Sequence, residues 1–420
     1  MLVDRWPTPT SGNLCCIRSL PGKRDPSVTQ VDYAAQACGH GFEFIRGEVL
    51  GVDRVARCIE LAALLADDGA ELVPRRWIPY DKLVLALGSV TNFYAVPGAA
   101  EHVLTLDDVP QAEAFRQRFV DGCIQASARN AASIDGDEGV DIVIVGGGAT
   151  GVELAAELSH SARTLARYKV HALDPVRHVR IRILERGSFL LPHLHPRLSK
   201  RAARHLRSLG IKVLTDTAVA RVGAAAVTDT EGGVYPSTIT LWAAGVEAPA
   251  VCASFGLPVN RLRQIVVAPT LQAVGDSHIY AIGDCASFIC PIKGTVPPRA
   301  QAAHQQAMFL AEALVRDDQA KAPVFAYRDY GSLVSLGPLA AVGMLRGAIG
   351  ERKMQVGGAL ARPVRIDVSQ TPDGLARFRA HGGTDCGGLD TGKALAVGEA
   401  ALRKRTRRTR LRAQLERGLQ

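Results

Sequence analysis

Three glycines, Gly146, Gly148 and Gly151, form a G-x-G-x-x-G pattern whose residue types and spacing suggest phosphate chemistry. An apolar stretch, 141–145, precedes them, and an amphipathic stretch, 152–158, follows. In a strand–turn–helix setting the first glycine permits a tight turn, the second lets a pyrophosphate approach, and the third lets helix and strand pack closely. The pattern predicts dinucleotide binding at a helix N-terminus, with a purely structural glycine turn as the alternative.

A carboxylate follows at the end of the next expected strand. Residues 179–184 alternate like a strand and lead into Glu185. A carboxylate at this place binds the ribose 2′-hydroxyl, which favours NAD(H) because it would repel a 2′-phosphate. The spacing exceeds the usual ~20 residues, and we assign the extra length to an extended helix and loop over 163–178. A solvated charge at the strand end is the alternative for Glu185.

The elements that must position these residues alternate between strand and helix over 140–250, which predicts an α/β fold. Two further apolar strands end in small-residue turns at Gly88 and Gly245, and a third ends at Gly283 and Asp284. The remaining elements that we expect are strands at 1–4, 42–49 and 58–62, helices at 31–40, 105–124 and 297–316, and a polar linker at 125–139. Beyond residue 345 the periodicity decays.

Composition limits the class of protein. A chain of 420 residues that is 47% hydrophobic can hold two or three domains. Its nine cysteines lack the spacing of a disulfide scaffold, and we recognise no signal peptide, so we expect a reducing, cytoplasmic compartment. The sequence has no run of about 18 apolar residues, so it predicts no membrane-spanning helix. We interpret Cys285 and Cys290 as small buried residues, and His193 and His195 as surface residues, and we expect no metal site.

The net charge of +9 is concentrated at one end of the chain. Residues 401–420 hold eight Lys or Arg and one Glu, a net charge of +7, which leaves +2 for the other 400 residues. Anionic lipid headgroups or nucleic acid would attract such a cluster, and a solvated tail is the alternative. We expect a membrane surface as the partner and no nucleic acid.

Five motifs occur in an order that resembles the type II NADH dehydrogenases, the single-subunit flavoprotein NADH:quinone oxidoreductases. The resemblance covers roughly residues 31–345. The motifs are 80–89 (YDKLVLALGS), 145–158 (VGGGATGVELAAEL), 242–246 (WAAGV), 281–286 (AIGDCA) and 299–307 (RAQAAHQQA).

This resemblance implies two Rossmann-like dinucleotide-binding domains, with the FAD domain split by an inserted NADH domain. The boundaries that we expect are 1–137 and 257–345 for the FAD-binding domain, 138–256 for the NADH-binding domain, and 346–420 for a degraded membrane-association region with its basic tail. The implied cofactors are FAD and NAD(H), and the implied partner is a quinone. The implied location is the cytoplasmic side of the cell membrane, as a peripheral protein, and a homodimer stays open.

The resemblance also implies roles for single residues. Gly146, Gly148 and Gly151 match the NADH pyrophosphate loop, and Glu185 matches the ribose ligand. The remaining implied cofactor-binding residues are Asp4, beside the adenosine ribose, Asp284, on the ribityl chain, and the turn glycines Gly88, Gly245 and Gly283. A turn aspartate at a strand end is the alternative for Asp284.

Three implied catalytic residues lie on two expected helices. Glu153 matches a glutamate near the nicotinamide and flavin, and a charge favoured by the helix dipole is its alternative. Gln301 and Gln305 match a pair near the quinone, and their i, i+4 spacing places both amides on one helical face. For both glutamines, the alternative is an ordinary polar residue on the surface of a helix.

The sequence departs from the family pattern in three places. The family opens with a strand–GxGxxG–helix unit for the FAD pyrophosphate, and we find only the end of its second strand at 1–4. Residues 8–24 and 362–400 also differ, which we interpret as frame disruption or a misplaced start. A soluble flavoprotein reductase with another acceptor, and an NADH-binding remnant without flavin, are therefore alternatives.

Overall fold

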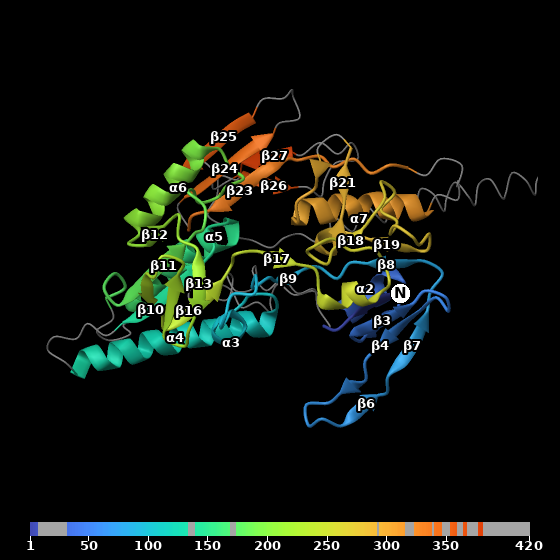
Figure 1. Ribbon diagram of the computed structural model, residues 1–420, viewed down its shortest axis with the longest axis horizontal. Coiled ribbons are helices and arrows are strands. Elements are labelled where there is room, and N and C mark those ends of the chain that lie inside the picture. Colours follow the sequence, from blue (N-terminus) through green and yellow to red (C-terminus); the bar gives the residue numbers. More distant parts are fainter. Residues whose placement is uncertain are drawn as a thin grey trace, which may run out of the picture.

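A four-stranded parallel sheet with the order β12–β11–β10–β16 forms the centre of one half of the molecule (Figure 1). Its strands are Val140–Val145 (β10), Val179–Leu184 (β11), Lys212–Leu214 (β12) and Ile239–Trp242 (β16). The computed structural model describes residues 1–6, 32–132, 139–168, 174–291, 294–315, 323–337, 340–346, 353–358, 364–367 and 377–380. Every residue of β10 is buried, as expected for a central parallel strand.

Alternate side chains of β10 face two different layers. Ile142 and Ile144 belong to a core shared with helices Val109–Ala132 (α4), Ala149–Arg167 (α5) and Pro196–Ser208 (α6). Val143 and Val145 pack instead with the meander of Val219–Val222 (β13), Ala226–Asp229 (β14) and Val234–Pro236 (β15). This follows from the two-residue period of a strand. The expected alternation of strand and helix over 140–250 did not include the meander.

The described part of the second half contains three parallel strand pairs, and the shortest is Ile265–Val266 (β18) with Ala286–Ser287 (β20). Leu2–Asp4 (β1) pairs with Phe44–Arg46 (β2), and Leu83–Leu85 (β8) pairs with Ile279–Ala281 (β19). No strand within the described ranges joins one pair to another. Helix Ala300–Val315 (α7) packs over β19, where Ala302 and Leu310 share a core with Leu85 and Ile279.

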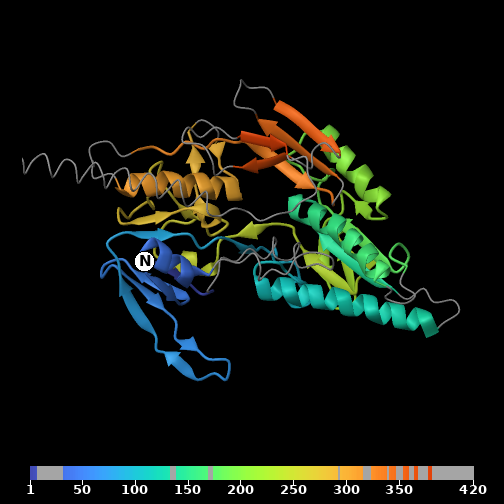
Figure 2. The same cartoon turned by 180° about the vertical axis from the view of Figure 1, so that it is seen from behind.

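The other elements of this half surround that core (Figures 1 and 2). An antiparallel sheet of Val49–Asp53 (β3), Cys58–Leu61 (β4) and Arg76–Pro79 (β7) lies beside helix Tyr33–His40 (α2). The hairpin of Leu64–Leu65 (β5) and Glu71–Val73 (β6) projects from the body in both views. The short elements are Ala99–His102 (α3), Ala250–Ser254 (η2), Ile265–Val266 (β18), Gly283–Cys285 (η3), Ala286–Ser287 (β20), Ile289–Cys290 (β21) and Gly294–Thr295 (β22).

An antiparallel pair, Val90–Thr91 (β9) with Val246–Glu247 (β17), connects the two halves (Figure 1). The Asp107 carboxylate fixes this connection, because it accepts hydrogen bonds from the Thr91 amide at 3.0 Å and the Thr91 hydroxyl at 2.7 Å. Chain segments that the sequence separates by about 150 residues are thereby held side by side.

Strands also form beyond residue 345, where the sequence predicted decaying structure. Gly331–Ser335 (β23), Ala341–Arg346 (β24) and Lys353–Gly358 (β25) make an antiparallel sheet, and Val364–Asp367 (β26) pairs with Arg377–Ala380 (β27). Strand β23 packs against α5. Residues 8–24, where the sequence departs from the family pattern, and the basic tail at 401–420 lie outside the described residues.

Two expected boundaries were wrong. The helix expected over 105–124 begins at Val109 and continues to Ala132, through much of the expected polar linker. The strand expected over 42–49 is two strands, β2 and β3, in separate sheets. The extended segment is interrupted at Gly47, between β2 and β3. A β-carbon on Gly47 would lie 3.0 Å from Leu61 Cδ1, and this close approach favours glycine.

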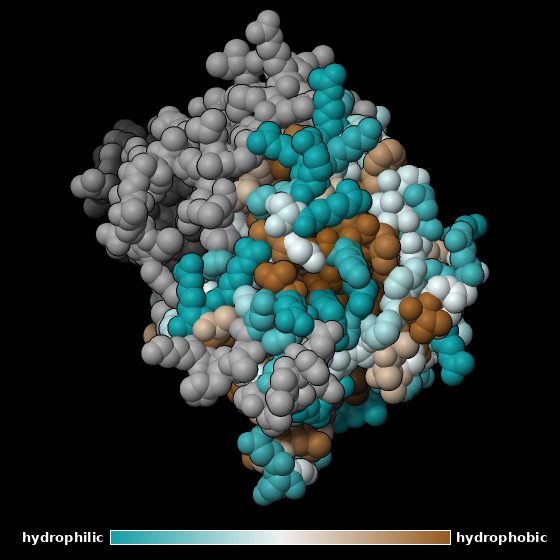
Figure 3. All heavy atoms as spheres, turned by 90° about the vertical axis from the view of Figure 1, so that its left-hand side faces the viewer, coloured by the Kyte–Doolittle hydropathy of each residue, from teal (hydrophilic) through white to brown (hydrophobic). Residues whose placement is uncertain are grey.

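Helix α6 carries an exposed basic face. Its exposed basic residues are Arg197, Lys200, Arg201, Arg204 and Arg207. Figure 3 views the molecule from the side where α6 lies in Figure 1, and hydrophilic side chains there surround a hydrophobic patch. None of the helices in the described ranges combines the length and apolar character needed to cross a bilayer.

Candidate functional site

The glycine-rich turn lies between β10 and α5, and its three glycines have different surroundings. A β-carbon on Gly146, whose φ is +110°, would lie 2.6 Å from the carbonyl carbon of Ala243. A β-carbon on Gly151 would overlap the carbonyl oxygen of Gly146. A β-carbon on Gly148 would meet no atom within 4 Å. Gly146 and Gly151 are therefore required by the fold, whereas Gly148 borders open space at the N-terminus of α5.

Glu185 follows β11 and lies against this turn. Its Oε2 accepts a hydrogen bond from the Gly147 amide at 2.6 Å, and its Oε1 accepts one from the Gly187 amide at 2.6 Å. Each carboxylate oxygen keeps a lone pair for a further donor. The structure thus brings the predicted ribose ligand and the predicted phosphate loop together.

The strand order defines where a ligand fits beside this turn. The chain runs from β10 outward to β11 and β12, and then returns to β16 on the other side of β10. In open α/β sheets, ligands bind outside the carboxyl ends of the strands at such a reversal. Gly146 follows β10 and Gly245 follows β16, so the two turns flank the predicted crevice.

A second constellation surrounds Asp284, which lies in the short helix η3 directly after β19. Ser89 Oγ donates to Asp284 Oδ2 at 2.9 Å, and Gln264 Nε2 donates to the Asp284 carbonyl oxygen at 2.8 Å. The Gly283 amide donates to Gln306 Oε1 at 2.7 Å, and Gln306 is buried. Ser89 and Gln306 stand in the motifs at 80–89 and 299–307 beside predicted residues, but the sequence did not show that their side chains reach Asp284 and Gly283.

Burial raises the pKa of the Asp284 carboxyl above its ordinary value, and the hydrogen bond from Ser89 partly opposes this shift. Within the described part of the chain no Lys or Arg forms an ion pair with it. Gly88, at φ +69°, lies next to Ser89, and a β-carbon there would meet no atom within 4 Å. A half-buried carboxylate beside an open glycine turn fits a polar, hydroxyl-bearing ligand such as the ribityl chain of a flavin.

Asp4 lies on β1, in another strand pair of this half. Its Oδ1 accepts a hydrogen bond from the Trp6 amide at 2.9 Å. Burial, and then the neighbouring Asp4 carboxylate, raise the pKa of Tyr33 to about 12. Asp4 is therefore held by local contacts, and the structure does not place it in contact with Asp284.

Glu153 lies on α5 and reaches the C-terminal sheet. Its Oε1 accepts a hydrogen bond from the Ser335 amide of β23 at 2.9 Å. Burial raises the pKa of the Glu153 carboxyl, and the Ser335 amide partly opposes the shift. A raised pKa is a property of proton-handling carboxyls as well as of structural ones.

Gln301 and Gln305 lie one turn apart on α7, and both amides contact the chain at 328–331. Gln305 Nε2 donates to the Arg328 carbonyl at 2.8 Å, and Gln305 Oε1 accepts from the Arg328 amide at 2.9 Å. Gln301 Nε2 donates to the Gly331 carbonyl at 3.1 Å, and its Oε1 accepts from the Tyr330 amide at 3.3 Å. The i, i+4 spacing therefore aligns two side chains that hold a neighbouring backbone segment.

Cys285 and Cys290 are buried, and burial raises the pKa of the Cys285 thiol to about 11. A thiol with that pKa stays protonated near neutral pH and reacts poorly. His193 and His195 are exposed, and His195 Nδ1 accepts from the Arg197 amide as the N-cap of α6. These residues have the structural roles that the sequence predicted.

Comparisons with known proteins agree with this geometry. The family model described as pyridine nucleotide-disulphide oxidoreductase matches residues 17–307. NDH2 of Plasmodium falciparum, solved in complex with NADH, has the same fold, with a TM-score of 0.72 over 86% of this chain and 87% of that one, at 19% identity. The chain is thus a member of the pyridine nucleotide-disulphide oxidoreductases, and the expected α/β, Rossmann-type fold is confirmed.

Curated relatives identify the family within that class. The type II NADH:quinone oxidoreductase of Haemophilus influenzae is 37% identical over 355 residues, which cover 81% of this chain and 79% of the relative. The protein of the same name from Staphylococcus aureus is 29% identical and covers 72% of each chain. The chain belongs to the type II NADH:quinone oxidoreductase family, as its sequence motifs predicted.

Proposed function

We propose that this protein oxidises NADH and delivers the electrons to a quinone through a bound flavin. The observation that carries the proposal is the short connection between the two constellations. Ser89, which binds Asp284, is three residues from Asn92, whose amide donates to the Gly245 carbonyl at 3.1 Å. Three residues span at most about 10 Å, so a ligand beside Gly245 and a ligand beside Asp284 would be close neighbours.

NAD(H) would occupy the crevice at the carboxyl ends of β10 and β16. The N-terminus of α5 would hold the pyrophosphate beside Gly148, while Glu185 would accept a hydrogen bond from a ribose hydroxyl. Gly146 and Gly151 would act through packing, because both are enclosed by backbone. Gly245 would border the nicotinamide end.

The flavin would be FAD, held by Asp284, Gly283 and Gly88 on one side and by Asp4 on the other. A bound flavin supplies the chemistry, since it accepts hydride from a nicotinamide and passes electrons on. The Asp284 carboxylate would accept a hydrogen bond from a ribityl hydroxyl, and the hydrogen bond from Ser89 would keep that carboxylate oriented. Glu153 would hold a proton near the reacting rings, supported by its raised pKa.

The quinone would bind near α7, where Gln301 and Gln305 hold the 328–331 segment. We propose that the two amides shape this site by positioning that backbone. The domain boundaries would be 1–137 with 257–345 for the flavin, 138–256 for NADH, and 346–420 for membrane association. A peripheral location on the cytoplasmic membrane face, through the basic tail, and a homodimer belong to the same proposal.

The proposal is tested with the purified protein. We expect a yellow chain whose flavin is bleached by NADH and recovers on addition of a short-chain quinone. A coloured protein that reduces ferricyanide but not quinone would indicate another acceptor. A colourless protein that still binds NADH would indicate a remnant without flavin, and would contradict the proposal.

The tail is tested separately. Deleting residues 401–420 lowers the net charge from +9 to +2. Binding to vesicles with anionic lipid should then weaken and lose its dependence on salt, because each basic residue near such a surface contributes about 1 kcal/mol. Equal binding by both chains would contradict the role of the tail.

A further inference from the structure

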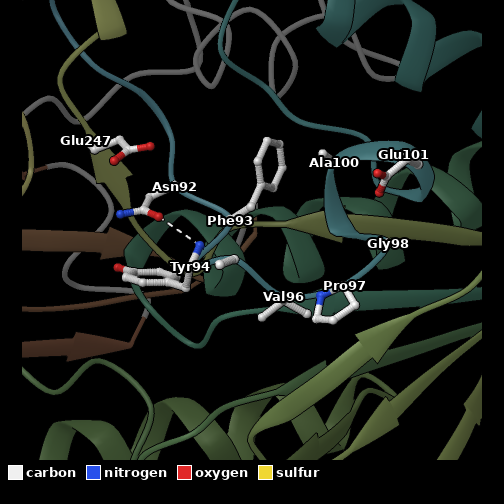
Figure 4. Close-up of a pocket in the computed structure, with 10 residues that line it drawn as sticks. Asn92, Phe93, Tyr94, Val96, Pro97, Gly98, Ala100, Glu101 and Glu247 are labelled. Atoms are coloured by element: carbon white, nitrogen blue, oxygen red, sulfur yellow. Dashed lines mark hydrogen bonds between the residues drawn. The ribbon is translucent and has the colours of Figure 1, made fainter.

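A cavity of about 390 Å³ lies beside the Gly245 turn (Figure 4). Residues 92–98, Ala100, Glu101 and Glu247 line it. The connection between the two halves of the molecule therefore does more than join them, because it also forms a hollow next to the crevice proposed for NAD(H).

Tyr94 lines this cavity and also lies close to Gly245. A β-carbon on Gly245 would overlap the Tyr94 hydroxyl and lie 3.1 Å from Tyr94 Cζ. The Tyr94 side chain is half exposed, so part of its ring surface is open to a ligand. Figure 4 shows the Tyr94 ring pointing away from Pro97, with its amide bonded to Asn92.

Three hydrogen bonds fix the backbone under this ring. The Tyr94 amide donates to Asn92 Oδ1 at 2.8 Å, the Asn92 amide donates to the Gly245 carbonyl at 3.1 Å, and Trp242 Nε1 donates to the Asn92 carbonyl at 2.8 Å. The ring is thus placed relative to the end of β16 and not merely to its own loop.

The backbone at this point is strained. Tyr94 has φ +51° and the next residue, Ala95, has φ +55°. Residues other than glycine rarely adopt this left-handed conformation, and bulky ones least of all. Such strain persists only where the surroundings enforce it, and it is concentrated at ligand sites. The two residues therefore mark the loop as a candidate binding element.

The strand order gives the ligand a direction. Glu185 follows β11, the glycine turn follows β10, and Gly245 follows β16, in that spatial order. A dinucleotide with its adenosine ribose at Glu185 and its pyrophosphate at Gly148 must extend its nicotinamide toward Gly245. Tyr94 lies at that end.

We propose that Tyr94 binds the nicotinamide ring, by packing the exposed part of its ring against it, and thereby favours complete dinucleotides over nucleotides that lack nicotinamide. The inference rests on the proposed function. Aromatic side chains bind other planar rings by such offset or edge contacts, and Gly245 has no β-carbon that would displace the Tyr94 ring from the end of β16.

Calorimetric titration of the full chain, with its flavin reduced beforehand by dithionite in the absence of oxygen, tests this inference with NADH and with ADP-ribose, which lacks only nicotinamide. Tyr94→Asn removes the ring and keeps a residue that tolerates the left-handed backbone. We expect it to weaken NADH binding about tenfold and ADP-ribose binding less than twofold. Tyr94→Phe, which retains the ring, should bind both like the wild type.

Tyr168→Asn is the matched control, because Tyr168 is exposed at the far end of α5. It should leave both affinities unchanged. Equal weakening of NADH and ADP-ribose by Tyr94→Asn, or no weakening of either, would overturn the inference while the proposed function stands. A wild-type chain that binds neither ligand would overturn the proposed function, and the inference with it.

Discussion

Gly148 and Gly151 belong to one turn, yet they respond to substitution for different reasons. A side chain at Gly148 enters open space, while a side chain at Gly151 enters the carbonyl oxygen of Gly146. The spacing of the motif predicted both residues. Only the packing around them separates Gly148, which borders the proposed pyrophosphate site, from Gly151, which the fold needs.

Gly148→Val should fold normally and lose NADH binding by at least a hundredfold, because its side chain would occupy the pyrophosphate position. Gly151→Ala should instead lower the free energy of unfolding by several kcal/mol, as overpacking against backbone does. Calorimetric titration and thermal melts measure both effects. NADH affinity that is unchanged in Gly148→Val would contradict the assignment of this loop.

Glu185 combines a predicted ligand role with a structural one, since it accepts hydrogen bonds from Gly147 and Gly187. Glu185→Arg should weaken NADH binding and shift selectivity toward NADPH by about tenfold, because a cation replaces the group that repels the 2′-phosphate. Glu185→Gln keeps one acceptor and serves as the control. A ratio of affinities for NADH and NADPH that does not change would argue against the ribose role.

Asp284 makes stability depend on pH. Its folded-state pKa is raised by burial, so protonation stabilises the fold below the unfolded pKa, and that stabilisation is lost as the pH rises through the folded pKa. At pH 7, Asp284→Asn should raise the free energy of unfolding by no more than about 1 kcal/mol, since water still screens a half-buried carboxylate. Urea unfolding at pH 7 and near pH 3.5 measures this difference, which should vanish at the lower pH. Flavin binding by the variant should weaken.

At the scale of elements, α7 acts as a support for the segment that follows it. Gln301 and Gln305 pair with main-chain groups of residues 328–331, much as a neighbouring strand would. This arrangement links α7, in the half of the molecule that contains β8 and β19, to the start of β23, whose far end contacts Glu153. The same strand therefore touches elements of both halves.

Gln305→Ala removes two hydrogen bonds to Arg328 and should cost about 1–3 kcal/mol of stability. We expect quinone reduction to fall more than ferricyanide reduction, because the backbone near the proposed quinone site would loosen. Gln117→Ala, on the exposed face of α4, is the control and should change neither rate. An equal fall in the rates of quinone and ferricyanide reduction would indicate that the substitution disturbs the flavin rather than the proposed quinone site.

Local sequence patterns predicted most helices and strands, whereas contacts between distant segments determine how the candidate site is assembled. The strand, the turn and the helix around Gly146 are encoded within about 20 neighbouring residues, so their sequence was sufficient. The contact between Asn92 and Gly245, like that between Glu153 and Ser335, joins residues more than 150 positions apart. No periodicity of a single segment reports such pairings. The meander was missed for a similar reason, since its strands are short and partly exposed.

At the scale of the whole molecule, the two halves differ in how completely their parallel strands are paired. Strand β10 has a partner on each side and every residue buried. Among the described strands, β1 and β8 each have one partner. Because a strand that is paired on both sides opens less readily, the halves should differ in local stability.

Amide hydrogen exchange should therefore be slowest at Ile142 and Ile144, and at least tenfold faster in β1 and β8. Adding NADH should slow exchange further in the half that contains β10, by mass action on the folded state. Mass spectrometry of peptic fragments measures both effects. Exchange in β8 as slow as that in β10 would contradict this difference.

The buried indole of Trp242 gives the protein an internal optical sensor. Of the chain's three tryptophans, Trp242 alone stands at the end of β16, next to the Gly245 turn, whereas Trp77 is half exposed on β7 in the other half of the molecule. Excited Trp242 would transfer energy to a reduced nicotinamide held beside it, so ultraviolet excitation should produce dinucleotide emission at the expense of indole emission. A water-soluble quencher would first remove the indole emission of the exposed Trp77. Dinucleotide emission excited through Trp242 would therefore follow one half of the unlabelled protein, and quenchable indole emission from Trp77 would follow the other.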